Sequence, residues 1–227
     1  MVPFIIETTP GVFVSESKNR FLCYIEINGE ITECYVPSSS RIENYLNLGG
    51  CEVLVTENNN KKSRTKYSLF AVNYRDRYII LNLNKVNTIL ESLIINGELY
   101  PETNYQVSKE KIKDGYKSDL FLEGEDHSIL VEAKGVISKD KIVRFPQVSS
   151  ARSIVQLKAL KELLDQGKIV HYYLVALSPI INKIEIDNKS DYYYHLQRCI
   201  SKGLFLRGVS ITFDGKTVNY SHEIVLN

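Results

Sequence analysis

The sequence contains no uncharged apolar stretch of about eighteen residues, the length that a membrane-spanning helix needs. Its first residues include Glu7 and lack the basic segment that precedes the apolar core of a secretory signal. We therefore expect a cytoplasmic protein that does not enter a membrane. The 44% hydrophobic and 24% charged residues are typical of a globular chain and argue against disordered, collagen-like and coiled-coil classes.

The sequence also lacks the signals of several chemistries. Its four cysteines form no Cys-x-x-Cys pair, so neither a zinc site nor a redox dithiol is predicted. Its histidines are not closely spaced, and no Walker, dinucleotide-binding or Gly-x-Ser-x-Gly pattern occurs. The formal net charge of +1 argues against a protein that coats nucleic acid, but it leaves local basic patches open.

The first third of the chain has the pattern of a small β-barrel. The apolar runs at 21–27 and 31–36 flank Asn28-Gly29, a strong hairpin signal. A short helix is expected near 41–48, before Gly49-Gly50, and further strands are expected at 51–57, 66–74 and 77–83. About five strands with one short helix between them favour an oligonucleotide-binding (OB) barrel.

The apolar spacing changes near residue 84, where we place the boundary between domains at 1–84 and 85–227. An amphipathic helix is predicted by five apolar residues at helical spacing, namely Val86, Ile89, Leu90, Leu93 and Ile94. Extended segments at 105–112, 116–122 and 128–134 precede a helix with Ile154, Leu157, Leu160 and Leu164 on one face. The run 169–177 resembles a parallel strand buried on both faces, and a helix at 189–202 and two strands follow. The order is αβββαβ, in a mixed α/β (α+β) chain.

The segment SDLFLEGEDHSILVEAKG, residues 118–135, holds the candidate chemistry. Alternation along a strand places Glu132 and Lys134 on one face, and an antiparallel hairpin would bring Asp119 to Glu132. Two carboxylates and the carbonyl of Ala133 would suit Mg²⁺ or Mn²⁺, with Lys134 orienting a water. A solvated hairpin with a surface Glu/Lys pair would produce the same pattern, so the residues alone leave both interpretations open.

Pieces spread along the chain carry a family resemblance. They are, in order, KNRFLCYIEINGE, VPSSSRIENYL, SRTKYSLFAV, LNKVNTILESLIINGEL, YKSDLFLEG, VEAKG, RFPQVSSARSIVQL and IEIDNKSDYYYHLQRCISKGLFLRGVSITF. The chain resembles the SfsA (sugar fermentation stimulation protein) family. That resemblance implies an OB-like domain followed by a PD-(D/E)XK domain that cleaves DNA or RNA. It also implies that Asp119, Glu132 and Lys134 are the catalytic residues.

The resemblance adds weaker candidates and shows two departures. Glu110 would complete the metal shell, Gln156 would contact the catalytic site, and Arg152 would contact nucleic acid, although a solvated strand or helix face accounts for each as well. The chain has SSSR at 38–41 and FPQVSS at 145–150, where the family usually has Asn-Pro-Gly-Arg and Phe-Pro-Asp-Ala-Pro-Thr. The rate or the substrate could therefore differ from the family's.

A basic and aromatic segment of the barrel is the candidate nucleic-acid surface. Its members are Lys61, Lys62, Arg64, Lys66 and Tyr67, to which we add Arg41. Lysines and arginines could follow the phosphates while tyrosine rings stack on bases. An ordinary solvated hairpin tip would have the same composition.

The leading hypothesis is a metal-dependent nuclease that acts on DNA or RNA. The alternative is a non-catalytic DNA-binding regulator of sugar (maltose) metabolism genes that retains the nuclease fold. A third hypothesis, a structural protein that only mediates interactions, predicts no affinity for nucleic acid. The choice of DNA or RNA, the strand preference, the endo- or exonuclease mode and a homo-oligomer are left open by the sequence.

Overall fold

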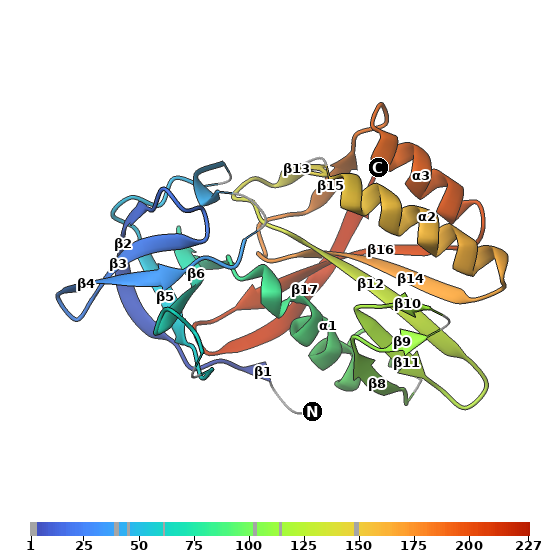
Figure 1. Cartoon of the computed structure of the whole chain (residues 1–227), viewed down its shortest axis with the longest axis horizontal. Coiled ribbons are helices and arrows are strands. Elements are labelled where there is room, and N and C mark those ends of the chain that lie inside the picture. Colours follow the sequence, from blue (N-terminus) through green and yellow to red (C-terminus); the bar gives the residue numbers. More distant parts are fainter. Residues whose placement is uncertain are drawn as a thin grey trace.

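The computed structural model describes the chain over residues 4–38, 41–44, 46–60, 62–101, 104–113, 115–147 and 150–227. Figure 1 shows a β-barrel at one end of the molecule and a larger open sheet beside it. Two hydrophobic clusters cover the two faces of the open sheet, and one of them continues into the barrel. No helix within these ranges is long and apolar enough to cross a membrane.

The barrel confirms the predicted OB-like fold. Its strands in the described ranges are β2 (Thr9–Glu16), β3 (Leu22–Ile27), β4 (Glu30–Tyr35), β5 (Glu52–Glu57), β6 (Tyr67–Tyr74) and β7 (Arg77–Ile80). Their order is β4-β3-β2-β5-β6-β7, and pairing of β4 with β6 closes the barrel. Asn28 and Gly29 both have positive φ, 52° and 82°, as the tight hairpin between β3 and β4 requires. The short helix is a single turn of 3-10 helix, η1 (Ile42–Asn44).

One barrel strand was not predicted from the sequence. β2 begins TPG, residues that usually indicate a turn, yet it pairs with both β3 and β5. Gly11 permits this close pairing, since a Cβ there would lie 2.7 Å from Cγ2 of Ile25 and 2.8 Å from the carbonyl oxygen of Glu26. The closed ring therefore consists of β2 to β6, and β7 lies beyond it.

The open sheet follows the predicted αβββαβ order with additions. After the short η2 (Leu83–Lys85), its elements are α1 (Val86–Ile95), β8 (Gln106–Lys109), β11 (Leu120–Glu123), β12 (Ser128–Val136), β13 (Ile142–Phe145), α2 (Ala151–Asp165), β14 (Ile169–Ala176), β15 (Lys183–Ile186), α3 (Asp191–Ile200), β16 (Phe205–Phe213) and β17 (Thr217–Leu226). The order across the sheet is β13-β15-β17-β16-β14-β12-β11-β8. A separate hairpin is formed by β9 (Ile112–Lys113) and β10 (Tyr116–Lys117).

The helices cover opposite faces of this sheet. The five apolar residues expected on the inner face of α1 are all buried. They pack with the odd-numbered residues of β12, whereas α2 and α3 pack with its even-numbered residues. The apolar run of β14 is parallel to both β12 and β16, as predicted. The four-residue strands β13 and β15 were not predicted.

The two sheets are also connected outside the linker. The backbone N–H of Ile80, at the end of β7, donates to the carbonyl of Leu177 (2.8 Å). The first strand, β1 (Phe4–Ile5), precedes the barrel in sequence but pairs with β17 of the open sheet. The division of the chain at residue 84 stays a prediction.

Candidate metal centre

The hairpin of β11 and β12 brings the two predicted carboxylates together. Its register pairs Leu120 with Val131, so Asp119 and Glu132 are the next residues to face each other. The Asp119 carboxylate also accepts a hydrogen bond at Oδ2 from the backbone N–H of Ala133 (3.0 Å). The ammonium of Lys134 lies 3.5 Å from Oε2 of Glu132. The hairpin interpretation and the metal-site interpretation are therefore compatible.

Every oxygen of these two carboxylates has a donor from another part of the chain. Oδ1 of Asp119 accepts from the amide of Asn87 on α1 (3.1 Å). Oε1 of Glu132 accepts from the hydroxyl of Tyr116 on β10 (2.6 Å), and Oε2 accepts from the amide of Gln156 on α2. Donors from several elements fix the orientation of both groups before any ligand binds.

Burial gives Glu132 unusual proton chemistry. Its side chain is fully buried, and burial followed by the nearby charge of Asp119 raises the pKa of its carboxyl to about 8. Lys134 and the hydrogen bond from Tyr116 act against this rise. Burial likewise raises the pKa of Tyr116, which keeps its hydroxyl protonated as a donor. A cation bound beside Glu132 would favour the ionised form and so oppose this rise in pKa.

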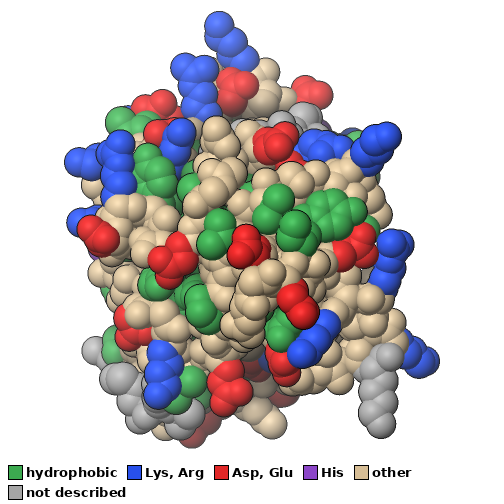
Figure 2. Space-filling model, turned by 90° about the vertical axis from the view of Figure 1, so that its left-hand side faces the viewer, with side chains coloured by type: hydrophobic (Ala, Val, Ile, Leu, Met, Phe, Trp, Pro, Cys, Tyr) green, Lys and Arg blue, Asp and Glu red, His purple; other side chains and the backbone are tan. Residues whose placement is uncertain are grey.

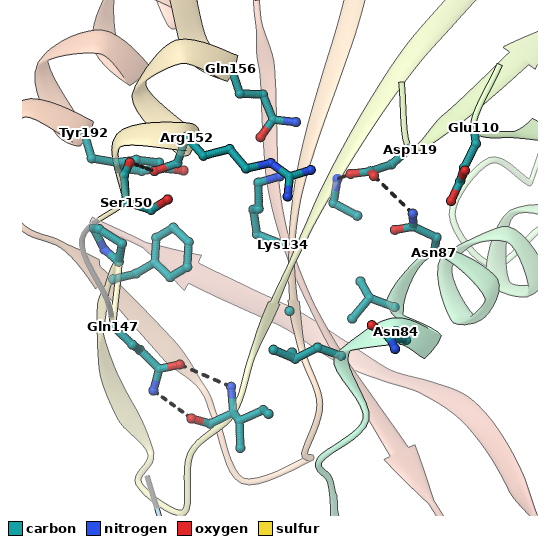
Figure 3. A pocket seen from close by; sticks show the side chains of 18 residues that line it. Asn84, Asn87, Glu110, Asp119, Lys134, Gln147, Ser150, Arg152, Gln156 and Tyr192 are labelled. Atoms are coloured by element: carbon teal, nitrogen blue, oxygen red, sulfur yellow. Dashed lines mark hydrogen bonds between the residues drawn. The ribbon is translucent and has the colours of Figure 1, made fainter. Parts of the chain in front are cut away.

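A cleft of about 720 Å³ opens beside the pair. It is lined by residues that include Glu110, Asp119, Lys134, Arg152 and Gln156, whereas Glu132 lies beneath its surface. Figure 3 shows the Arg152 side chain extending from α2 towards Lys134. A ligand in this cleft would meet the acidic residues Asp119 and Glu110 as well as the cationic groups of Lys134 and Arg152.

Gly135 sets the shape of the cleft floor. A Cβ at this position would lie 2.6 Å from Cδ2 of Leu83 and 2.8 Å from Cγ2 of Val86. The glycine therefore lets β12 pack closely against η2 and the start of α1. This packing holds α1, and with it Asn87, next to Asp119.

The structure does not bring Glu110 into the cluster. Its carboxylate forms an ion pair with Lys117 (2.5 Å), although its backbone N–H donates to the carbonyl of Asp119 (3.0 Å). Among the residues described, no group of three or more His, Cys, Asp or Glu side chains is placed to hold a metal. The donor set present is thus two carboxylates beside Ala133, and a metal role for Glu110 stays a prediction.

At position 147 this chain has glutamine where the resembled family usually has aspartate, and the structure shows what the glutamine does. Its side-chain amide donates to the carbonyl of Ile137 (2.7 Å), and its oxygen accepts from the N–H of the same residue (3.4 Å). An aspartate, the usual residue of the resembled family, could not donate the first of these bonds. Gln147 therefore ties the loop before α2 to the chain just after β12. The neighbouring positions 148 and 149, like 39 and 40, lie outside the described residues.

The basic residues of the barrel are mostly engaged locally. Arg64 pairs with Glu33 (3.5 Å) and Lys66 with Glu57 (3.7 Å). The guanidinium of Arg41 donates to the carbonyls of residues 17 and 18 (3.1 and 2.8 Å). Lys62 is exposed, Lys66 lies over the ring of half-buried Tyr67 (5.0 Å between Nζ and the ring centroid), and Lys61 lies outside the described residues. The predicted surface is therefore present in part but largely neutralised.

A second hollow of about 620 Å³ adjoins this loop. Arg64, Asn58 and the aromatic residues Phe21 and Tyr35 are among its lining residues, and it shares Asn84 with the first cleft. The end face of the barrel is different in character: acidic and hydrophobic side chains gather at its centre and most Lys and Arg lie towards its rim (Figure 2). Acidic side chains at the centre of that face would repel a polyanion.

Comparisons with known proteins agree with the fold. A family model described as the sugar fermentation stimulation protein RE domain matches residues 84–217, and one described as the SfsA N-terminal OB domain matches residues 16–81. A sugar fermentation stimulation protein homolog of Clostridium beijerinckii is 24% identical over 204 residues, covering 88% of this chain and 89% of its own. A homolog of Clostridium acetobutylicum is 31% identical over 152 residues, 66% of each chain.

A solved structure shows the same fold. The structure of Pyrococcus furiosus SfsA in complex with Ca²⁺ has a TM-score of 0.84 at 19% identity, and the similarity covers 100% of this chain and 99% of that one. The family matches and this likeness confirm an OB barrel followed by a domain of the restriction-endonuclease-like class.

Sequence reasoning missed two residues of the site. Neither Asn87 nor Tyr116 was predicted, yet each donates to one of the carboxylates. Asn87 lies on the polar side of an amphipathic helix, and Tyr116 lies in what was expected to be an ordinary strand. No local pattern distinguishes either residue.

Proposed function

Because this chain belongs to the sugar fermentation stimulation (SfsA) family and has its restriction-endonuclease-like domain, we propose that it is a metal-dependent nuclease. Its substrate would be the phosphodiester backbone of DNA or RNA. The observation that supports this proposal most is the convergence of Asp119 and Glu132 beside Lys134 at the edge of a cleft.

The residues present suit a hard divalent cation. Two carboxylates at the end of one hairpin offer the oxygen ligands that Mg²⁺ and Mn²⁺ prefer, and Ala133 lies between Glu132 and Lys134. Burial and then the charge of Asp119 raise the pKa of Glu132, and a cation would relieve the repulsion between the two carboxylates. The Ca²⁺ named for the Pyrococcus furiosus relative, another oxygen-binding cation, supports the same class of ligand here.

The chain's own side chains have separate tasks in this proposal. Asp119 and Glu132 hold the cation, which when bound would polarise the phosphate and lower the pKa of a water. Lys134 orients the attacking water and stabilises charge on the phosphate. Gln156 positions Glu132, and Arg152 binds the phosphate backbone on the far side of the cleft.

The direct test compares cleavage by wild type with that of the isosteric variants Asp119→Asn and Glu132→Gln. Labelled single- and double-stranded DNA and RNA are incubated with Mg²⁺, Mn²⁺ or EDTA. We expect both variants to lose roughly a thousandfold or more in rate with the fold intact. The control is Glu123→Gln, at the other end of β11, which should cleave normally. Equal cleavage by wild type and both site variants would refute the proposal.

One observation favours a second function, the non-catalytic regulator. All four carboxylate oxygens already accept hydrogen bonds from the protein, so their orientation does not require a cation. A regulator would show salt-sensitive DNA binding that persists in EDTA, with no cleavage under any divalent metal. Cleavage by wild type that Glu132→Gln abolishes would exclude it.

A further inference from the structure

The second hollow lies where the barrel meets the segment that leads into α1. Its lining residues come from strands β3 to β6, from the loop between β5 and β6, and from the segment 82–88. It shares Asn84 with the first cleft, and the next residue, Lys85, also lines it. Figure 3 shows Asn84 on the same side of the first cleft as Asn87. A chain-like ligand in the first cleft could therefore continue into the second hollow past residues 84 and 85.

Hydrogen bonds hold the walls of the second hollow in place. The amide of Asn58 donates to the carbonyl of Thr65 (2.9 Å) and to its hydroxyl oxygen (3.2 Å). The oxygen of the same amide accepts from the hydroxyl of Ser68 (2.6 Å). The N–H of Leu83 donates to the carbonyl of Pro37 (3.0 Å), which joins the barrel to the segment before α1. The hollow is therefore preformed, as binding sites for small groups usually are.

Asn82 is a buried polar residue of this hollow whose hydrogen bonding is incomplete. Only 4% of the residue is exposed, and its side-chain oxygen accepts from the N–H of Asn84 (3.1 Å). That bond fixes which end of the amide is the donor, and the amide nitrogen has no acceptor among the residues that the structure describes. A buried donor without a partner is costly unless a ligand or a water supplies an acceptor. Asn82 therefore offers a ligand in the hollow a fixed hydrogen-bond donor.

The other lining groups suit a nucleotide. Phe21 is 39% exposed and Tyr35 is half-buried, so the hollow offers aromatic rings to a planar base. Lys85 has no carboxylate partner within the described ranges, so its ammonium is available to a phosphate. Glu57 also lines the hollow, but its carboxylate pairs with Lys66 (3.7 Å). A base has a ring to stack and atoms that accept a hydrogen bond, and its phosphate carries the charge that Lys85 would meet.

We propose that the second hollow binds one unpaired nucleobase of the strand that occupies the first cleft. The guanidinium of Arg20 already lies over the ring of Phe21 (4.5 Å from its centroid), so the base stacks on Tyr35. The base accepts a hydrogen bond from the amide of Asn82, and Lys85 binds the phosphate between the base and the cleft. The inference rests on the proposed function, because it requires nucleic acid in the cleft. It adds a preference for single strands, since the bases of a duplex are stacked and paired.

The test separates the base contact from the phosphate contacts. Fluorescence anisotropy in EDTA gives the affinities for oligothymidylate, for oligouridylate and for abasic strands of the same length and sugar. We expect wild type to bind the strand with bases roughly tenfold more tightly than the abasic strand. Tyr35→Ala should remove most of this ratio. Asn82→Asp keeps the oxygen that accepts from Asn84 but lacks the donor, so it should reduce the ratio roughly threefold. The charge that Asn82→Asp adds acts on both strands and cancels in the ratio.

Tyr24→Ala is the matched control, because Tyr24 is a partly exposed tyrosine on β3 of the same barrel but lines neither hollow. It should keep the wild-type ratio. Lys85→Ala should weaken the binding of both strands equally and reduce the salt slope by about one. Thermal unfolding checks that the variants are folded, and the nearly isosteric Asn82→Asp decides the matter if Tyr35→Ala is not.

The outcomes distinguish this inference from the proposed function. If wild type cleaves nucleic acid with Mg²⁺ but the folded variants keep its ratio, the inference is wrong while the proposed function stands. If wild type neither binds nor cleaves any nucleic acid, both fail. Thymidine and uridine 5′-monophosphates, added as competitors, test for a free nucleotide as the source of the base. Binding of either as tight as that of the strand would assign the hollow to a free nucleotide and overturn the inference.

Discussion

The carboxylate pair and the basic loop of the barrel use charged residues in opposite ways. Glu132 is fully buried and is oriented by donors from distant segments, whereas Arg64 keeps 76% of its side chain exposed and pairs with Glu33. In a buried site whose ligands are oriented by hydrogen bonds, the loss of one donor atom strongly lowers metal affinity or activity. An exposed ion pair contributes little interaction energy, because water and salt screen it. The predictions below test whether the two regions differ as sharply in function.

The largest predicted effect is the change of metal affinity with pH, which we expect to act through the carboxyl of Glu132. Its pKa of about 8 in the folded, cation-free protein exceeds its ordinary value of 4.5. A cation must displace this proton, so the affinity for Mn²⁺ should rise about tenfold per pH unit below pH 8 and level off above it. Isothermal titration across this range would measure it, and a flat profile would contradict the assignment of Glu132 as a ligand.

The carboxyl of Glu132 should also make the free energy of unfolding depend on pH when EDTA removes divalent cations. Between about pH 4.5 and pH 8 the folded protein binds more protons at Glu132 than the unfolded chain does. The contribution of this group to the free energy of unfolding therefore decreases as pH rises through that window and is constant above it. Urea unfolding should show a smaller decrease for Glu132→Gln than for wild type. An equal decrease would place the responsible group elsewhere.

The next largest effect is expected from a change at Tyr116, the hydrogen-bond donor to Glu132 that the sequence did not predict. Tyr116→Phe deletes only the hydroxyl that holds Oε1 of Glu132. We expect metal affinity to fall by roughly tenfold or more, because partners that orient metal ligands typically contribute that much. The control is Tyr105→Phe, which deletes a hydroxyl that bonds the exposed His127 (2.8 Å). If both variants bind Mn²⁺ like wild type, the hydroxyl of Tyr116 does not position the site.

Much of this architecture could be predicted from the sequence, because it depends on local patterns. The spacing of apolar residues predicted α1 and β14. The turn after β11 predicted the hairpin that places Asp119 opposite Glu132. Strand alternation placed Lys134 on the same side as Glu132. These features follow from periodicity and turn chemistry within short segments.

The rest could not be predicted, because it depends on contacts between distant segments. Asn87 lies 32 residues from Asp119 and Tyr116 lies 16 from Glu132, and no spacing rule connects either pair. β2 was missed because Gly11 is needed for close strand pairing, although glycine usually indicates a turn. Gln147, noted from the sequence only as a departure, forms two backbone hydrogen bonds.

A moderate effect is expected at Arg152, the cationic residue of α2 that lines the cleft. It has no carboxylate partner within the described ranges, so its charge is available to a phosphate. Arg152→Ala should weaken nucleic-acid binding in EDTA roughly five- to tenfold and reduce the salt slope by about one. Arg198→Ala is the control, since Arg198 on α3 is also exposed but does not line the cleft. Equal losses in both variants would indicate non-specific attraction.

The smallest effect should be that of Arg64 in the barrel loop, because Glu33 already partly neutralises it. Arg64→Ala should weaken binding only about two- to threefold, and Glu33→Gln should strengthen binding by about twofold, since it releases the guanidinium. The double variant should match Arg64→Ala, because Glu33 acts through Arg64 alone. If Arg64→Ala instead loses as much affinity as Arg152→Ala, the barrel loop is a primary contact. Local pairing would then not explain the contrast between the two regions.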